Sequence, residues 1–231
     1  MGKRAPKRFA PLDAARTQNP HGAPLLKGII FDVDGTLCKP QSYMFAQMRQ
    51  ALGIPKSTDI LDHLHSLPQP AQDEAQTAIR AIERAAMVEQ EAQPGLIELI
   101  SYLEGRGVRM GLCTRNFDAP VTHLLQTFLP GKTFAPIITR DFRPPKPDPA
   151  GILHIARAWE LDDGAESVIM VGDSMDDMVA GYKAGAATVL LACKENEGLV
   201  EHECTGVAIG RLDELVGMLE VGFEERDREG E

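Results

Sequence analysis

Short apolar runs alternate with amphipathic stretches along most of this chain. Five runs have the length and composition of buried strands: 28–33, 108–113, 136–139, 167–172 and 187–192. Between them, apolar residues recur at the three- and four-residue spacing of helices that bury one face, as Leu96, Leu99, Ile100 and Leu103 do. Strands that alternate with helices predict an α/β fold, in which a parallel sheet carries helices on both faces.

One stretch, residues 40–93, breaks this alternation. It holds no run of strand type and predicts three helices, at 43–52, 59–67 and 72–90. The stretch follows the first strand directly, and open parallel sheets bind ligands at the carboxyl ends of their strands, so an insertion there is placed to act as a lid. We therefore expect a doubly wound, mostly parallel Rossmann-like sheet formed by 25–39 and 94–219, with a small all-helical cap domain at 40–93.

The two ends of the chain differ in charge from its centre. Residues 1–24 carry five basic side chains against the single acid Asp13, and residues 220–231 carry six acids against two arginines. Such charge runs are typical of solvated segments, so we expect a disordered basic arm at 1–24 and an acidic, frayed tail at 220–231. The arm also fits an organelle transit segment, because those are rich in arginine and poor in acids.

Composition narrows the range of partners. The formal net charge of −10 argues against a nucleic-acid binder, which needs lysine and arginine to neutralise phosphates. The four cysteines are widely spaced and form no C-x-x-C pair, which predicts reduced thiols rather than disulfides or a zinc site. No apolar run approaches the length of about 18 residues that a membrane span requires. We expect a cytoplasmic protein, with an organelle such as the mitochondrion as the alternative, and no pattern assigns its oligomeric state.

Residues whose side chains can react or bind a metal lie at the ends of three apolar runs. Asp32 and Asp34 end the first, Thr114 follows the second and Asp173 follows the fourth, while Lys146 lies in a proline-rich loop. The carboxyl ends of parallel strands meet at one edge of a sheet, so these groups should converge. Clustered carboxylates repel each other unless a cation is present, and their hard oxygens suit Mg²⁺. A carboxylate can also attack phosphorus and carry the phosphoryl group.

Four short motifs occur in order over residues 28–192. They are Phe-Asp-Val-Asp-Gly-Thr-Leu at 31–37, Leu-Cys-Thr at 112–114, Lys-Pro-Asp-Pro at 146–149 and Val-Gly-Asp-Ser-Met-Asp-Asp at 171–177. The ordered set resembles the four signatures of the haloacid dehalogenase superfamily. By this resemblance the chain looks like a phosphatase-type hydrolase with a small helical cap inserted after the first motif.

The resemblance implies a role for each acid. Asp32 would be the nucleophile and a ligand of Mg²⁺. Asp34 would protonate the leaving oxygen and then activate water, while its backbone carbonyl binds the metal. Asp173 would complete the metal site. Asp177 would support the site by pairing with Lys146 or with the metal's waters, and Asp176 is the alternative for that role.

Phosphate-binding groups are implied in the same way. The Thr114 hydroxyl, the Arg115 backbone N–H and the Lys146 ammonium would bind the transferring phosphoryl group. Arg115 departs from the Asn or Ser that is frequent after the threonine of the second motif. Its backbone role is unaffected by this difference, whereas the contacts of its side chain are not given by the resemblance.

The second acid of the first motif, Asp34, favours hydrolysis. Related ATPases have a threonine there and dehalogenases lack the acid, whereas a carboxyl group can take a proton from water. We predict Mg²⁺-dependent hydrolysis of a phosphate monoester of a small metabolite, through an aspartyl-phosphate on Asp32. A phosphosugar mutase of the same superfamily is the enzymatic alternative, and a receiver-like signalling domain that accepts phosphate is the non-enzymatic one. Nothing in the cap identifies the substrate.

Overall fold

A computed structural model describes residues 5–13, 19, 22–41, 43–58 and 60–227 of the chain. It divides the chain into two compact units. Unit 1 joins residues 1–38 to residues 92–231, and unit 2 is Lys39–Glu91. Parts of the expected arm and tail, at 1–4, 14–18, 20–21 and 228–231, lie outside the described residues.

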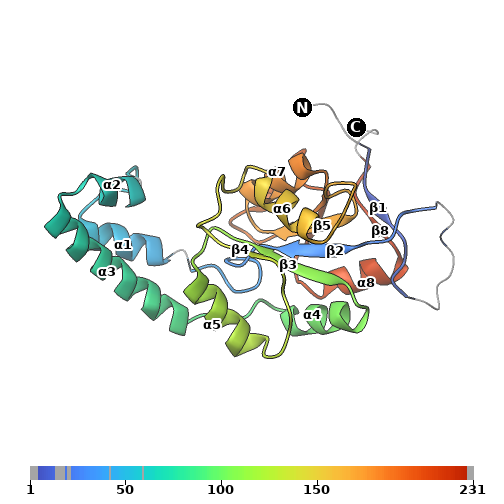
Figure 1. Ribbon diagram of the computed structural model, residues 1–231, viewed down its shortest axis with the longest axis horizontal. Helices are drawn as coiled ribbons and strands as arrows, with labels where there is room; N and C mark the ends of the chain where they lie inside the picture. Colours follow the sequence, from blue (N-terminus) through green and yellow to red (C-terminus); the bar gives the residue numbers. More distant parts are fainter. Residues whose placement is uncertain (1–4, 14–18, 20–21, 42, 59, 228–231) are drawn as a thin grey trace. The chain divides into compact units, whose positions relative to one another are not determined.

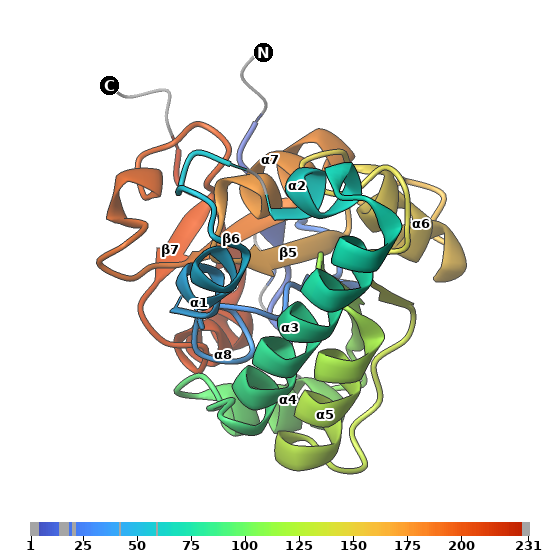
Figure 2. The same ribbon diagram turned by 90° about the vertical axis from the view of Figure 1, so that its left-hand side faces the viewer.

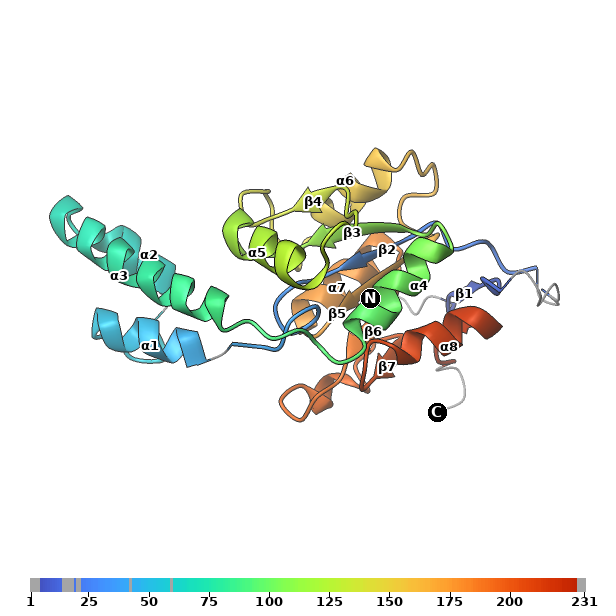
Figure 3. The ribbon, with the colours of Figure 1, turned by 90° about the horizontal axis from the view of Figure 1, so that it is seen from below.

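Unit 1 is built on a six-stranded sheet in which all neighbouring strands are parallel (Figure 1). The strand order is β4-β3-β2-β5-β6-β7, and the labels can be followed in Figure 3. The strands are β2 (Gly28–Phe31), β3 (Arg109–Cys113), β4 (Ile137–Ile138), β5 (Val168–Gly172), β6 (Ala187–Leu191) and β7 (Val207–Ile209). The predicted α/β fold with a parallel sheet is therefore confirmed. The chain runs outward from β2 to β4 on one side and then returns to β5 on the other. The order of the strands thus reverses beside β2, where open sheets of this kind place their ligands.

Helices cover both faces of this sheet because its strands alternate their side chains between two cores. In β2, Ile29 and Phe31 join one core and Ile30 joins the other. The first core packs against α4 (Leu96–Gly105), α5 (Asp118–Phe128) and α8 (Glu214–Val221), and the second against α6 (Ala150–Ala158) and α7 (Met175–Ala184). Figure 3 shows α4 and α8 side by side on their face of the sheet.

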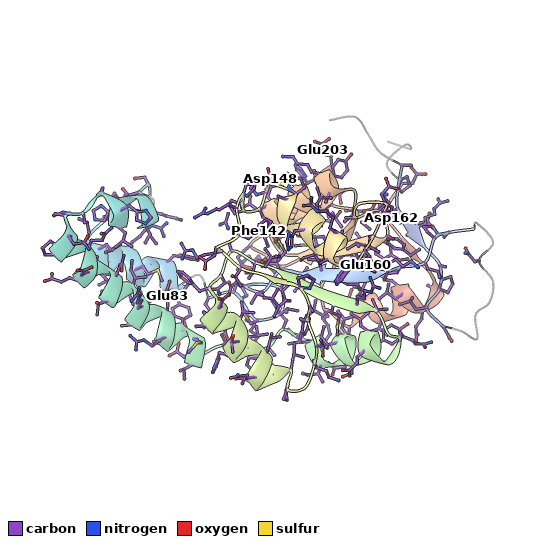
Figure 4. The ribbon with its side chains drawn as sticks, viewed as in Figure 1. Glu83, Phe142, Asp148, Glu160, Asp162 and Glu203 are labelled. Carbon is purple, nitrogen blue, oxygen red and sulfur yellow. The ribbon has the colours of Figure 1, made fainter. Side chains whose placement is uncertain are left out.

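The loops that contain the third and fourth motifs lead directly into the helices α6 and α7. Ser174 and Asp177 form a capping box at the start of α7, where each side chain bonds to the backbone of the other residue. Before α6, Asp148 accepts a hydrogen bond from the Ala150 N–H at 2.9 Å, and the cap position is Pro149. Figure 4 labels Asp148 in the segment that leads from β4 to α6. Both hydrogen-bonded turns lie where a loop of the sheet edge enters its helix.

A short antiparallel ladder joins the two ends of unit 1. In it, β1 (Arg8–Phe9) pairs with β8 (Phe223–Glu224), and the rings of Phe9 and Phe223 lie 5.8 Å apart within the core. The buried Glu225 carboxylate accepts hydrogen bonds from the backbone N–H groups of Lys7 and Thr188. The structure therefore differs from the expected disordered arm and frayed tail over these described residues, because apolar burial and a satisfied carboxylate outweigh the charge of both segments.

Unit 2 is a group of three helices, α1 (Tyr43–Leu52), α2 (Ile60–Ser66) and α3 (Gln69–Val88), labelled in Figure 2. Its small core combines residues from all three: Met48, Ile60, Leu64, Ala75 and Ile79. The ends of the unit are held together by the Lys39 Nζ–Glu91 Oε2 ion pair at 2.5 Å and by a backbone hydrogen bond between the same residues. Its action as a lid remains a prediction. Within the described helices, none is both long and apolar enough to cross a membrane.

Candidate active site

Asp32 lies at the carboxyl end of β2, in the centre of the sheet. Its backbone N–H donates a hydrogen bond to the Val171 carbonyl at 2.9 Å, which continues the ladder between β2 and β5. Its side chain is only 10% exposed, and its Oδ1 lies 2.6 Å from the Lys146 ammonium. The expected nucleophile is thus a buried carboxylate that is already oriented by a cation.

Lys146 lies between two acids that come from different strand ends. Besides Asp32 it contacts Asp177, with Nζ 2.5 Å from Oδ1, and all three side chains are almost completely buried. The other Asp177 oxygen accepts hydrogen bonds from the N–H and hydroxyl of Ser174. Both carboxylate oxygens of Asp177 are therefore occupied, and its position against Lys146 is fixed by the start of α7.

Asp173 faces the loop after β2 at very short range. A Cβ at Gly35 would stand 2.1 Å from Asp173 Oδ2, and Gly35 has a φ of +84°, so this close approach requires glycine. The Thr36 hydroxyl lies 3.5 Å from the other Asp173 oxygen. Carboxylate oxygens of Asp32, Asp173 and Asp177 all lie within 4.8 Å of one another. The structure thus brings together the acids of the first and fourth motifs.

The charges of this cluster do not balance. Burial raises the pKa of Asp32, and although Lys146 opposes the shift, the Asp177 and Asp34 carboxylates add to it. Burial also raises the pKa of Asp173 to about 7, with the Asp177 carboxylate as the next cause. Burial disfavours the Lys146 ammonium, but Asp177 and Asp32 outweigh burial and raise the pKa of Lys146.

The three clustered acids fit a divalent cation. When ionised they face one ammonium, which leaves two negative charges uncompensated in a buried site. Their donors are hard oxygens, the type that Mg²⁺ prefers. Asp177 is engaged with Lys146 and Ser174, so Asp32 and Asp173 are the side chains best able to ligate an ion. The cluster could therefore bind a metal.

Asp34 stands at the solvent side of the cluster. Its carboxylate accepts a hydrogen bond from the Asn116 amide, with Nδ2 2.7 Å from Oδ2. Partial desolvation by the surrounding protein raises the pKa of Asp34, although the Asn116 bond lowers it. Asn116 also donates its backbone N–H to the Thr114 hydroxyl at 3.1 Å. A single amide residue thus connects the second acid of the first motif to the threonine of the second.

Arg115 and Asp176 form an ion pair with each other, with NH1 2.5 Å from Oδ2. The Arg115 side chain is 61% exposed, while Thr114 beside it is buried. Of the two neighbouring acids on α7, Asp177 is therefore the one that contacts Lys146, and Asp176 contacts Arg115.

Sequence reasoning missed three amide residues that hold the site together. Asn116 binds Asp34, as described above. Gln93 donates its side-chain amide to the Gly35 carbonyl at 2.7 Å, and Asn196 donates to the Asp173 carbonyl at 2.7 Å. Asn116 could have been found, since it lies two residues after Thr114, but nothing in the sequence marks Gln93 or Asn196.

Comparison with known proteins identifies relatives of this chain. The family model described as haloacid dehalogenase-like hydrolase matches residues 48–185. An uncharacterized hydrolase of Saccharomyces cerevisiae, YOR131C, is 41% identical over 89% of this chain and 96% of the yeast protein. Phosphoglycolate phosphatase 1 of Pseudomonas aeruginosa is 31% identical over 54% of this chain and 46% of that protein.

The fold is also found among solved structures. The crystal structure of a predicted phosphoglycolate phosphatase from Haemophilus somnus superposes with a TM-score of 0.69 at 18% identity, covering 84% of this chain and 97% of that one. At this identity the likeness concerns the fold, and it matches the doubly wound sheet described above.

Proposed function

This chain belongs to the haloacid dehalogenase-like hydrolase family, and we propose that it hydrolyses phosphate monoesters of small metabolites with Mg²⁺, through a phosphorylated Asp32. One observation carries the proposal: the buried Asp32 carboxylate is held by Lys146 within a cluster of acids at the switch point of the sheet. The phosphatase name of the Pseudomonas relative supports the same class of substrate.

The first half of the reaction would transfer the phosphoryl group to the protein. An Asp32 oxygen forms a bond to phosphorus while the bond from phosphorus to the leaving oxygen breaks, and Asp34 gives that oxygen a proton. Lys146, the Thr114 hydroxyl and the Arg115 N–H bind the phosphoryl oxygens. Asp32 and Asp173, with the Asp34 backbone carbonyl, would hold Mg²⁺, which when bound supplies positive charge for the phosphoryl oxygens.

The second half would return Asp32 to its free form. A water molecule gives a proton to the Asp34 carboxylate and its oxygen forms a bond to phosphorus. The bond between phosphorus and the Asp32 oxygen then breaks, and inorganic phosphate leaves. Asp34 is suited to both steps because Asn116 holds its carboxyl group at the open side of the cluster. The carboxyl that protonates the leaving oxygen is thus the base that activates water.

Phosphate release from p-nitrophenyl phosphate tests the proposal. We expect release with Mg²⁺ and none with EDTA, because the negative charge of the acid cluster is not compensated without a divalent cation.

Asp173→Ala tests the metal site itself. It should raise the Mg²⁺ concentration for half-maximal activity at least about tenfold, since even the loss of a residue that only hydrogen-bonds to a metal ligand costs that much affinity. Asp162→Ala, a change of an exposed acid in the turn after α6, serves as the control. Folded protein that is inactive across a broad panel of phosphate esters would refute the proposal, and isomerisation without release would indicate a mutase.

Asn116→Ala tests whether the amide positions Asp34. A hydrogen bond to a charged group is worth about 1.5–3 kcal/mol, so we expect kcat/KM for an alkyl phosphate, which reports the steps through phosphoryl transfer to Asp32, to fall about tenfold or more. The loss for p-nitrophenyl phosphate should be much smaller, because its leaving group departs without a proton and the later attack of water, which also uses Asp34, does not enter kcat/KM. The ratio of kcat/KM for the two esters is the measurement. An equal loss for both would show that Asn116 supports the fold of the loop rather than proton transfer to the leaving oxygen.

A further inference from the structure

We propose that Arg140 and Phe117 form a subsite beside Asp34 that binds a second anionic group, carried by the leaving portion of the substrate. The subsite lies entirely within unit 1. The inference rests on the proposed function, because it takes the position of the leaving group from the role of Asp34. It narrows the substrates to phosphate esters with a further oxyanion, either a carboxylate or a second phosphate.

Asp34 fixes the direction in which the leaving group lies. The acid must reach the leaving oxygen to protonate it, so residues that flank Asp34 border the leaving portion of the ester. Asn116 contacts Asp34 directly, at 2.7 Å, and its own Oδ1 accepts a hydrogen bond from the Phe117 N–H at 2.7 Å. The Phe117 side of this turn is thereby tied to the acid, and Phe117 is 38% exposed.

Arg140 is held against the same turn by two contacts. Its backbone N–H donates to the Asn116 carbonyl at 3.0 Å, and its guanidinium carbon lies 4.0 Å from the centroid of the Phe117 ring. A guanidinium over an aromatic face keeps the N–H donors at its edge available for a planar oxyanion. Among the described residues, no carboxylate forms an ion pair with Arg140.

Arg115 shows by contrast why Arg140 is the candidate. The Arg115 guanidinium is neutralised by Asp176 at 2.5 Å, so it offers little net attraction to another anion. Acids outnumber cations in this neighbourhood, because Asp32, Asp34 and Asp173 lie close together and the buried Lys146 ammonium is already engaged by Asp32 and Asp177. A second anionic group on the substrate would be repelled there unless an uncompensated cation faced it, and Arg140 supplies one.

Matched phosphonates test the subsite without turnover. Each ligand in the first series has a carboxylate tail (phosphonoacetate, 3-phosphonopropionate and 4-phosphonobutyrate), and each is paired with the alkylphosphonate of equal chain length. A propylene-1,3-bisphosphonate arm distinguishes a phosphate-like tail from a carboxylate. Calorimetry with Mg²⁺ gives the dissociation constants. We expect at least one anionic tail to bind about tenfold or more tightly than its neutral match in the wild type, the range of one charge-assisted hydrogen bond.

Variants assign that preference to a residue. Arg140→Gln should reduce the affinity ratio of anionic to neutral ligand to about one, whereas Arg157→Gln, the same change at an exposed arginine of α6, should retain it. Equal affinities at every chain length in the wild type would overturn the proposal. So would a ratio that survives Arg140→Gln, or one that is lost in Arg115→Gln instead. Failure to hydrolyse p-nitrophenyl phosphate would refute the proposed function alone, because the binding ratio is read without turnover.

Discussion

Asp32→Asn is expected to abolish phosphate release, with kcat reduced by at least about 10³-fold, in the range found when a covalent nucleophile is removed. The carboxamide is nearly isosteric with the carboxylate, but it is a poor nucleophile and carries no negative charge toward phosphorus. The change leaves the orienting groups in place, because Lys146 keeps its contact with Asp177. Activity should therefore be lost through chemistry rather than through rearrangement.

The same variant should be at least as stable as the wild type. Burial raises the pKa of Asp32, which means that the folded protein disfavours its charged form. A neutral asparagine removes that unfavourable charge while filling the same space. Urea unfolding can be followed in unit 1 alone, because the single tryptophan, Trp159, is buried there. Stability that equals or exceeds the wild-type value would separate loss of chemistry from loss of fold.

Asp162→Asn is the matched control for this prediction. Asp162 is an exposed acid in the turn that follows α6, and Figure 4 labels it there. Its substitution should change kcat by less than about twofold, as surface substitutions alter free energies by only about 0.5 kcal/mol. Asp32→Asn protein that is folded and still releases phosphate at the wild-type rate would contradict the aspartyl-phosphate mechanism. Mass spectrometry of wild-type protein quenched during turnover should show one added phosphoryl group on Asp32.

The convergence of the candidate site residues could be predicted because it follows from local pattern and sheet topology. Asp32, Thr114 and Asp173 each follow an apolar run, and strands of a parallel sheet end at one edge. The choice between Asp176 and Asp177 could not be settled in this way. Adjacent residues point about 100° apart on a helix, so the rotation of α7 against the sheet decides which one faces Lys146. That rotation depends on tertiary packing, and it places Asp177 inside the cluster.

Long-range pairing accounts for most of what the sequence did not reveal. The strands β1 and β8 have two residues each, too few to show an alternating pattern, and they come from opposite ends of the chain. Their pairing depends on Phe9 and Phe223 finding each other in the folded core. Gln93 and Asn196 were missed for a similar reason, since each side-chain amide donates a hydrogen bond to a backbone carbonyl of a loop that is distant in the sequence. Such a residue belongs to no local hydrophobic pattern, because its partner comes near only in the folded protein.

Lys146→Met should destabilise unit 1 by about 3–5 kcal/mol, the usual cost of removing one partner from a buried ion pair. The ammonium is the shared partner of Asp32 and Asp177, and all three side chains are buried. Methionine fills a similar volume but leaves two carboxylates facing each other without a cation. The measurement is urea unfolding followed by Trp159 fluorescence, in EDTA. Activity should also be lost, because the Lys146 ammonium would no longer bind the oxygens of the phosphoryl group.

Lys132→Met is the control for the lysine variant. Lys132 makes an ion pair of similar length with Glu104, at 2.5 Å, but on the surface, where such pairs contribute about 0–1 kcal/mol. If Lys146→Met lowered the free energy of unfolding by no more than Lys132→Met does, the inference that Lys146 compensates buried negative charge would be contradicted.

Two further comparisons separate charge from packing. In an Asp32→Asn background the cost of Lys146→Met should be smaller, because one fewer carboxylate is left unpaired. Added Mg²⁺ should restore part of the lost stability, because a cation bound by Asp32 and Asp173 replaces positive charge that the lysine supplied. A packing defect would respond to neither change. If both effects are observed, Lys146 and a metal ion share one electrostatic role: each compensates the negative charge of the clustered acids and so keeps Asp32 ionised for attack on phosphorus.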